Sequence, residues 1–415
     1  MIQVVAPSKL SGKVYVPASK SDAQRAILAA ALAKGTSELI GVGPSDDEQA
    51  MLKAVKQLGA KISVISATKI QVEGIQQAPV SCHLSVGESG LAARLLSAVS
   101  ATFGAEIVLE GHGSLNTRPF HFYEEVLPQF GARVQTTNGC LPLSVIGPLQ
   151  GSVIAVDGSL SSQYISGLLM ALPLADGNSS LQVNHLASWP YVAMTMATLN
   201  SFGIEINHTQ MASFSITGNQ RYQAISYHID GDWSAASYWL VAAALGHSVS
   251  ISGLKMSSLQ ADKHLLDILM KAGCKIIHSE KGLQVDGSNR MPFECDATDC
   301  PDLFPALVVL AASVKGVSTI KGALRLIHKE SNRAAVLKQE FAKLGVLIEL
   351  KEDEMLVYGT GEIAGGEVHS NNDHRIAMCL AIAGTIANAE VTIHNSEAVS
   401  KSYPEFWKRF DALMG

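Results

Sequence analysis

The chain has 415 residues, a length that favours two domains over one. Charged residues make up only 16% and apolar residues 47%, so a large part of the chain must be buried. The formal net charge of −6 argues against nucleic acid or an anionic membrane as a partner, and an anionic ligand would need a local group of cations.

The N-terminal 20 residues alternate polar and apolar side chains and contain no signal-peptide core. The longest apolar stretches, around residues 167–175 and 306–313, are too short to span a bilayer. The six cysteines have neither metal-site nor disulfide-framework spacing. We therefore expect a reduced, cytoplasmic protein that needs no metal or organic cofactor. We also expect a monomer.

A unit of about 70 residues recurs six times. In chain order, a helix-like segment with a small-residue stop and then a strand appears as KQLGAKI, PQFGARV, NSFGIEI, MKAGCKI, AKLGVLI and finally DALMG. The stop glycines recur at intervals of 70 or 72 residues: Gly59, Gly131, Gly203, Gly273, Gly345 and Gly415. Glycine suits the position after a helix, where a positive φ strains other residues. Each unit is predicted to contain a helix, a strand, an amphipathic helix and further strands.

The first helix predicted in each unit is apolar on nearly all sides. In chain order these helices are AQRAILAAALAKG, GLAARLLSAVSATFG, QYISGLLMALPLADG, AASYWLVAAALG, FPALVVLAASVKG and RIAMCLAIAGTIA. A helix without a polar face belongs inside a domain. We expect three such helices at the centre of each domain with strands around them, although an α/β solenoid would show the same period.

A polar segment precedes each apolar helix. These segments are PASKSD, VGESG, DGSLSSQ, DGDWS, TDCPD and NNDH, and their residue types favour helix capping, with His374 expected as a cap. Several also hold side chains that a cap does not need, such as Lys20, Arg25, Gln163 and Arg375. If the helices run parallel, their partly positive N-termini lie at one end of each domain and attract anions.

Further cations precede the amphipathic helices, at Arg118, Lys329, Arg333 and Lys401. Glu330 and Arg333 are three residues apart on a predicted helix. Taken alone, that spacing favours a surface ion pair worth only about 0.3–0.5 kcal/mol.

Taken together and in this order, the motifs resemble the enolpyruvyl transferase family. SKS with a following arginine, SLNTRP, DGSLSSQ, PD, KESNR, NDHR and a late lysine extend over the chain from Val16 to Phe406. The resemblance is closer to the branch that acts on shikimate 3-phosphate. The branch that acts on UDP-N-acetylglucosamine typically has Lys-Asn in place of Lys20-Ser21, and a catalytic cysteine that the loop EGHGSLNTRPF lacks.

The resemblance implies a two-domain, inside-out α/β barrel with six repeats, three in each domain. Residues 1–18 and 230–415 would form domain 1 and residues 19–229 domain 2, with the active site in the cleft between them. It also implies an enzyme that transfers the enolpyruvyl (1-carboxyvinyl) group of phosphoenolpyruvate to the 5-hydroxyl of shikimate 3-phosphate and releases phosphate. This reaction belongs to the shikimate pathway, which leads to chorismate and the aromatic amino acids.

The family pattern also implies the site residues. Shikimate 3-phosphate would be bound by Lys20, Ser21, Arg25, Ser161, Ser162, Gln163, Ser188, Asp302 and Lys329. Phosphoenolpyruvate would be bound by Lys20, Gly90, Arg118, Gln163, Arg333, Arg375 and Lys401. Asp302 would take the hydroxyl proton and Glu330 would handle the proton at the methylene carbon. Because Lys329 and Arg333 favour an ionised Glu330, Lys20 is the alternative proton donor.

One motif departs from the family pattern. The family usually has Asn-x-Gly-Thr where this chain has Glu88-Ser89-Gly90-Leu91. A carboxylate there should weaken the binding of phosphoenolpyruvate unless Glu88 points away or is paired. This motif keeps open a paralogue that uses another phosphorylated acceptor. Two further alternatives are the UDP-sugar branch, which the missing loop cysteine disfavours, and a repeat scaffold without catalytic activity.

Overall fold

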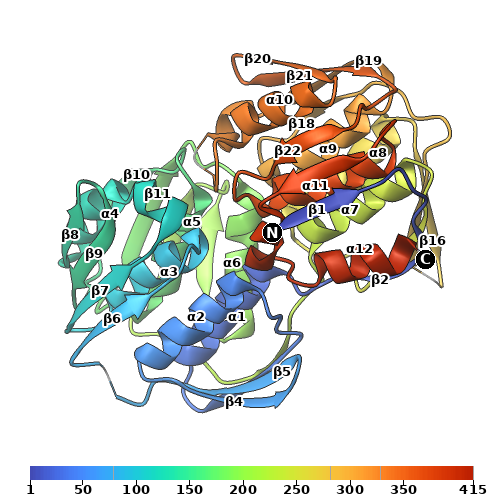
Figure 1. Cartoon of the computed structure of the whole chain (residues 1–415). Helices are drawn as coiled ribbons and strands as arrows, with labels where there is room; N and C mark the ends of the chain where they lie inside the picture. The colour runs from blue at the N-terminus through green and yellow to red at the C-terminus, as the bar shows by residue number, and fades with distance from the viewer. Residues whose placement is uncertain (78, 281, 328, 415) are drawn as a thin grey trace. The chain divides into compact units, whose positions relative to one another are not determined.

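The computed structural model describes residues 1–77, 79–280, 282–327 and 329–414, so the stop glycine expected at position 415 lies outside the described residues. The chain divides into two compact units. Unit 1 consists of Met1–Pro17 and Gly231–Gly415, and unit 2 of Ala18–Asp230. Figure 1 shows the elements along the chain, from blue at the N-terminus to red at the C-terminus.

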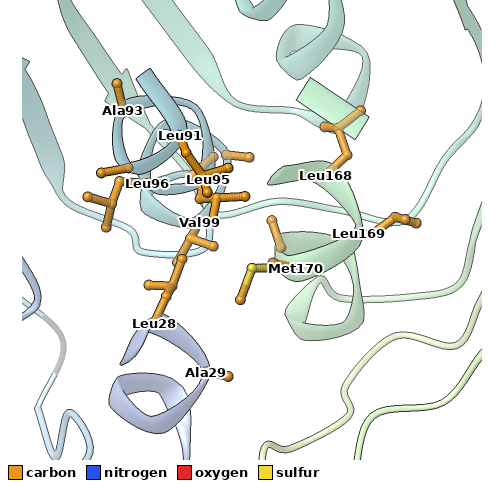
Figure 2. Close-up of a cluster of buried hydrophobic side chains, with 14 of the residues drawn as sticks. Leu28, Ala29, Leu91, Ala93, Leu95, Leu96, Val99, Leu168, Leu169 and Met170 are labelled. Carbon is orange, nitrogen blue, oxygen red and sulfur yellow. The ribbon is translucent and has the colours of Figure 1, made fainter. Parts of the chain in front are cut away.

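The apolar segments form the central helices of each unit. In unit 2 these are α1 (Lys20–Leu32), α3 (Gly90–Ser100) and α5 (Ser162–Ala171). In unit 1 they are α7 (Trp233–Ala244), α9 (Phe304–Ala312) and α11 (His374–Thr385). Every residue of α3 and of α9 is buried. Figure 2 shows how Leu28 of α1, Val99 of α3 and Met170 of α5 meet in one apolar cluster.

In the described part of unit 2, three four-stranded sheets accompany these helices. The first has the order β14 (Ser226–His228), β3 (Thr36–Ile40), β5 (Lys69–Glu73), β4 (Lys61–Ser66). The second has the order β6 (Ser81–Ser85), β7 (Glu106–Glu110), β9 (Cys140–Ile146), β8 (Arg133–Thr137). The third has the order β10 (Val153–Asp157), β11 (Ser179–Asn184), β13 (Ser213–Ile216), β12 (Ile206–Thr209). In each sheet the first two strands are parallel and the other pairings antiparallel.

Unit 1 repeats this pattern, but the start of the chain contributes two strands. One sheet has the order β16 (Lys275–Ser279), β17 (Gly282–Asp286), β15 (Ser248–Ser252), β2 (Ser11–Tyr15). Another has the order β18 (Glu294–Asp296), β19 (Lys315–Lys321), β21 (Glu354–Thr360), β20 (Leu347–Lys351). The last has the order β1 (Ile2–Val5), β23 (Val391–His394), β22 (Gly366–His369). The antiparallel pairing of β1 with β23 thus completes the sheet of the sixth repeat.

Where the structure describes the stop glycine, each outer helical segment ends just before it, as the glycine spacing predicts, and in the second repeat this segment is a helix followed by a 3-10 turn. The outer helices are α2 (Asp46–Gln57), α4 (His121–Val126), α6 (Trp189–Ser201), α8 (Leu265–Lys271), α10 (Arg333–Lys343) and α12 (Phe406–Met414). The five described stop glycines have φ values of 77° to 108°. Short 3-10 turns are η1 (Gly113–Thr117), η2 (Leu127–Phe130), η3 (Leu172–Leu174), η4 (Ala261–His264), η5 (Pro301–Leu303), η6 (Ala323–Leu326) and η7 (Ser396–Lys401).

Capping at the central helices is also as expected, with two exceptions. A side-chain oxygen of the N-cap residue accepts a backbone N–H at five helices, and these residues are Ser19, Ser89, Ser161, Asp232 and Asp373. At α9 the N-cap position is Leu303, which makes no such bond. The expectation that His374 caps α11 is wrong, because the preceding Asp373 does so. Among the described helices, none is long and apolar enough to cross a membrane.

Candidate active site

In unit 1, Asp302 is the centre of a network of ion pairs. It lies on η5, immediately before α9. Its Oδ1 is 2.8 Å from Nη1 of Arg333 and 3.4 Å from Nζ of Lys329. Its Oδ2 is 3.0 Å from Nη2 of Arg375. Two cations of the fifth repeat, Lys329 and Arg333, and one of the sixth, Arg375, therefore meet at one carboxylate.

Arg333 is buried, and its guanidinium contacts three carboxylates. Besides Asp302, its Nη2 donates to Oε2 of Glu330 at 2.7 Å, and its Nε donates to Oδ2 of Asp373 at 2.9 Å. The side chain of Arg333 is 0% exposed. The reading of Glu330 and Arg333 as a surface ion pair is therefore wrong. The three carboxylates keep the pKa of Arg333 above its ordinary value although burial opposes this.

Asp373 connects the capping of α11 to this network. Its Oδ1 accepts the backbone N–H of Arg375 at 2.9 Å, and its Oδ2 also accepts the hydroxyl of Ser331 at 3.2 Å. The same carboxylate thus fixes the start of α11 and the orientation of Arg333. Lys401, the last residue of η7, is buried as well.

The charges around Asp302 shift the ionisation of the network. Burial opposes ionisation of Asp302, but Arg375, Lys329 and Arg333 together hold its pKa well below the ordinary value. Burial lowers the pKa of Lys329. At neutral pH Asp302 is therefore a carboxylate held by cations.

Asp262 is a titratable residue of this region that the sequence reasoning missed. It lies on η4, is buried, and accepts a hydrogen bond from the hydroxyl of Ser234. Burial and the nearby charge of Asp302 raise the pKa of Asp262 to about 7. Nothing in the segment SLQADKHL distinguishes this aspartate from an exposed loop residue, so only the packing identifies it.

In unit 2, Lys20 forms an ion pair with a carboxylate. Lys20 is the first residue of α1, and its Nζ is 2.9 Å from Oδ2 of Asp47, in the first turn of α2. Both side chains are mostly buried. Asp47 was not among the predicted site residues. An acidic residue in a first helical turn is so common that the sequence alone gives it no functional meaning.

Arg25 connects α1 to α6. Its Nε donates to Oγ1 of Thr195 at 2.7 Å, and its Nη groups donate to the backbone oxygens of Ser21 at 2.7 Å and Tyr191 at 3.2 Å. Burial lowers the pKa of Arg25 to about 10, so it remains a cation at neutral pH. Ser188, the N-cap residue of α6, is buried with φ 56° and accepts the N–H of Tyr191 at 3.1 Å. Ser21, Arg25 and Ser188 thus belong to one bonded group.

A second group in unit 2 forms where α3 and α5 begin. Nη1 of Arg94 donates to Oε1 of Gln163 at 2.9 Å. A Cβ atom at Gly90 would lie 2.9 Å from Nη1 of Arg94 and 2.9 Å from Nη1 of Arg118. Ser161 caps α5 by accepting the N–H of Gln163, and Ser162, the first residue of that helix, is buried. The predicted residues Gly90, Arg118 and Gln163 are therefore brought together.

Arg94 is the cation that the sequence reasoning missed in this group. It is buried, and its Cζ lies 5.2 Å from the ring centroid of Phe120 and 4.9 Å from that of Tyr164. These distances allow cation–π attraction, which supports a buried guanidinium. An arginine within the otherwise apolar segment GLAARLL was the available signal, because a buried cation requires partners.

The site has the composition of an anion-binding site rather than a metal site. No group of three or more histidine, cysteine, aspartate or glutamate residues with metal-binding geometry occurs among the residues that the structure describes. All six cysteines are free thiols. The donors gathered in each unit are instead arginine and lysine side chains, which bind carboxylates and phosphates.

Comparison with known proteins gives one family over nearly the whole chain. Residues 4–410 match the family described as EPSP synthase (3-phosphoshikimate 1-carboxyvinyltransferase). The 3-phosphoshikimate 1-carboxyvinyltransferases of Clostridium beijerinckii and Clostridium acetobutylicum are 36% and 38% identical to this chain, and each match covers 99% of the chain and 96% of the relative. An EPSP synthase structure from Acinetobacter baumannii superposes with a TM-score of 0.80 at 27% identity, over 99% of this chain and 98% of that one. The expected two-domain, inside-out α/β fold is thereby confirmed.

Proposed function

Because the chain belongs to the EPSP synthase family, we propose that it transfers the enolpyruvyl group of phosphoenolpyruvate to the 5-hydroxyl of shikimate 3-phosphate and releases phosphate. Within the structure, the observation that carries the proposal is the network in which Asp302 contacts Lys329, Arg333 and Arg375. The curated relatives favour this reaction over that of the UDP-sugar branch.

The charges of the substrates explain why such a network is useful. Phosphoenolpyruvate and shikimate 3-phosphate together carry two carboxylates and two phosphate groups, so bringing them together requires several cations. Arginine suits this task because its planar guanidinium binds an oxyanion through two parallel hydrogen bonds. We assign Arg118, Arg333, Arg375 and Lys401 to phosphoenolpyruvate, with Gly90 leaving room beside Arg118. We assign Ser21, Arg25, Ser161, Ser162, Ser188 and Lys329 to shikimate 3-phosphate, and Lys20 and Gln163 to both.

The reaction needs one group that accepts a proton and one that donates a proton. The 5-hydroxyl oxygen forms a bond to C2 of phosphoenolpyruvate, its proton passes to Asp302, and C3 gains a proton. The resulting tetrahedral adduct loses phosphate and a proton from C3, which restores the carbon–carbon double bond. Anionic substrate that binds Arg333 and Arg375 competes with their contacts to Asp302, and this makes Asp302 a better base than in the free protein.

We propose Glu330 as the group that delivers the proton to C3. Its contact of 2.7 Å with Arg333 favours the carboxylate form in the free protein. Substrate phosphate at Arg333 weakens that preference, so proton delivery is coupled to substrate binding. Lys20 is the alternative donor, and its ion pair with Asp47 favours a charged ammonium.

One assay tests the reaction and the assignment of these residues. Phosphate release from phosphoenolpyruvate is measured with shikimate 3-phosphate or with UDP-N-acetylglucosamine as acceptor, and release is expected only with the former. Lys20→Met, in unit 2, and Glu330→Gln, in unit 1, should each lower kcat by about 10²–10⁴-fold without unfolding the protein. Release with the UDP-sugar would contradict the proposed acceptor. Wild-type rates in both variants would contradict the assigned roles.

We further propose that the enzyme acts as a monomer in the cytoplasm. The six free thiols support a reducing compartment. Light scattering coupled to size exclusion should give a mass near 43.9 kDa, and twice that mass would contradict a monomer.

A further inference from the structure

We propose that Glu88 is a positioning residue that orients Arg118 through Ser114. Glu88 lies in the segment just before α3, and Ser114 lies on η1, just before Arg118. The inference rests on the proposed function, because it gives Arg118 the role of binding phosphoenolpyruvate.

Two hydrogen bonds connect the three residues. Oε1 of Glu88 accepts the backbone N–H of Ser114 at 3.3 Å. The hydroxyl oxygen of Ser114 accepts a hydrogen bond from Nη2 of Arg118 at 3.2 Å. The carboxylate therefore fixes the backbone of Ser114, and its side chain in turn fixes one end of the guanidinium.

The backbone around Ser114 is shaped to admit the carboxylate. Gly113 has φ 58°, and a Cβ atom there would lie 1.4 Å from Oε1 of Glu88. The carboxylate thus occupies space that any other residue at position 113 would fill. The N–H of His112 also donates to the backbone oxygen of Gly87 at 3.0 Å, so the two segments are joined on both sides of Gly113.

Arg118 depends on this connection for its orientation. Its side chain is buried, yet within the described residues its Nε has no hydrogen-bond partner. Nη1 lies near Gly90 and Nη2 is held by Ser114. Releasing Ser114 would therefore let the guanidinium rotate away from the start of α3.

This arrangement resolves the objection to a carboxylate at position 88. Oε1 of Glu88 accepts a backbone N–H and also lies 3.8 Å from Nδ1 of the exposed His112, and an uncharged amide oxygen can accept the same N–H. The positioning role therefore needs an acceptor of the right length and does not need the negative charge. Glu88→Gln should keep it, and Glu88→Ala should remove it.

The test compares KM values for the two substrates. Glu88→Ala and Ser114→Ala should each raise KM for phosphoenolpyruvate by roughly tenfold, the factor expected for one lost hydrogen bond of ordinary strength, with KM for shikimate 3-phosphate unchanged. Glu88→Gln should restore the wild-type KM. Glu110→Ala, which removes an exposed carboxylate of the same unit, controls for the change in net charge.

The Arg118→Ala background separates this inference from the proposed function. If Arg118 binds phosphoenolpyruvate, Arg118→Ala raises KM for it, and adding Glu88→Ala should raise KM no further. If Arg118→Ala leaves KM unchanged, the assignment of Arg118 fails. If Arg118→Ala raises KM but Glu88→Ala does not, or if the two effects multiply, the positioning role of Glu88 is overturned. An equal rise in both KM values for Glu88→Ala would also overturn it.

Discussion

Asp302 and Arg333 form an ion pair in which the arginine side chain is 0% exposed and the carboxylate 20% exposed, with 2.8 Å between Oδ1 and Nη1. Arg375 and Lys329 also contact this carboxylate, so its charge balances cations that are largely removed from water. The same cations are assigned to substrate. A change at Asp302 should therefore affect both stability and catalysis.

We expect Asp302→Asn to lower kcat by about 10²–10⁴-fold, because an amide cannot take the hydroxyl proton. It should also lower the free energy of unfolding by roughly 3 kcal/mol near pH 7, because buried cations lose a charged partner. Because folding lowers the pKa of Asp302, the ionised carboxylate stabilises the fold at pH values above its unfolded-state pKa of about 3.9. The stabilisation is lost as pH falls through the lower folded-state pKa.

Urea unfolding of wild type and variant at several pH values checks this expectation. The stability difference should shrink as pH falls below about 4, where Asp302 begins to lose the advantage of its low pKa. Asp411→Asn, at an exposed position of α12 in the same unit, is the matched control. A difference that grew as pH falls below about 4 would contradict the assigned ionisation.

Gly90→Ala should separate substrate binding from stability. The added Cβ would lie 2.9 Å from Nη1 of both Arg118 and Arg94, so both guanidinium groups must move. We expect KM for phosphoenolpyruvate to rise about tenfold, equivalent to about 1.4 kcal/mol. Alanine is favoured over glycine in a helix interior by up to about 1 kcal/mol, which offsets part of the cost of moving the two guanidinium groups, so thermal stability should change little. Steady-state kinetics with each substrate varied test the expected KM, and a rise confined to KM for shikimate 3-phosphate would contradict it. A melting curve tests the expected stability, and a large fall in melting temperature would contradict that.

Local chemistry made much of the fold predictable from the sequence. The stop glycines identify where helices end because the positive φ there is a local requirement, and the apolar helices identify the core because they have no polar face to expose. Most of the predicted cations were found for a similar reason, since they lie in or beside a polar segment at a helix start.

The burial of the charged groups could not be predicted in this way. The partners of Arg333 include Asp302 and Asp373, which are 31 and 40 residues away along the chain. Local spacing therefore suggested only the weak surface pair with Glu330. Asp47, Arg94 and Asp262 were missed because their partners, or the burial that gives them meaning, come from other elements of the fold.

His247 should make unit 1 sensitive to acid. Its Nδ1 accepts the N–H of Leu10 at 3.1 Å, its Nε2 lies 2.8 Å from Oγ1 of Thr385, and burial together with Lys9 lowers its pKa to about 4. A neutral histidine whose pKa is lowered by folding contributes its full stabilisation at pH values above its unfolded-state pKa of about 6.5. This stabilisation is lost as pH falls from about 6.5 to the folded-state pKa of about 4. The expected loss is roughly 3 kcal/mol.

His247→Asn should flatten this pH dependence, because asparagine offers an acceptor to Leu10 but takes up no proton. Melting temperatures measured from pH 7.5 to pH 4.5 provide the comparison. His278→Asn, at an exposed position on β16 in the same unit, should leave the wild-type slope unchanged. An equally steep slope in His247→Asn would show that another group causes the acid sensitivity.

Two glycines of unit 2 allow the energetic contribution of a positive φ at a stop glycine to be measured. Gly131 follows η2 with φ 85°, and a Cβ there would meet nothing closer than 3.8 Å, so the cost of Gly131→Ala comes from backbone conformation alone. We expect a loss of about 1–2 kcal/mol in the free energy of unfolding, and a smaller loss for Gly131→Asn, because asparagine tolerates this conformation better.

Gly104 does not have a positive φ and has nothing within 4 Å of an added Cβ. Gly104→Ala should therefore be neutral or stabilise by about 0.4–1 kcal/mol through the unfolded chain. Equal losses in the two alanine variants, measured by urea unfolding, would mean that positive φ is not what requires glycine at the end of each repeat's helix.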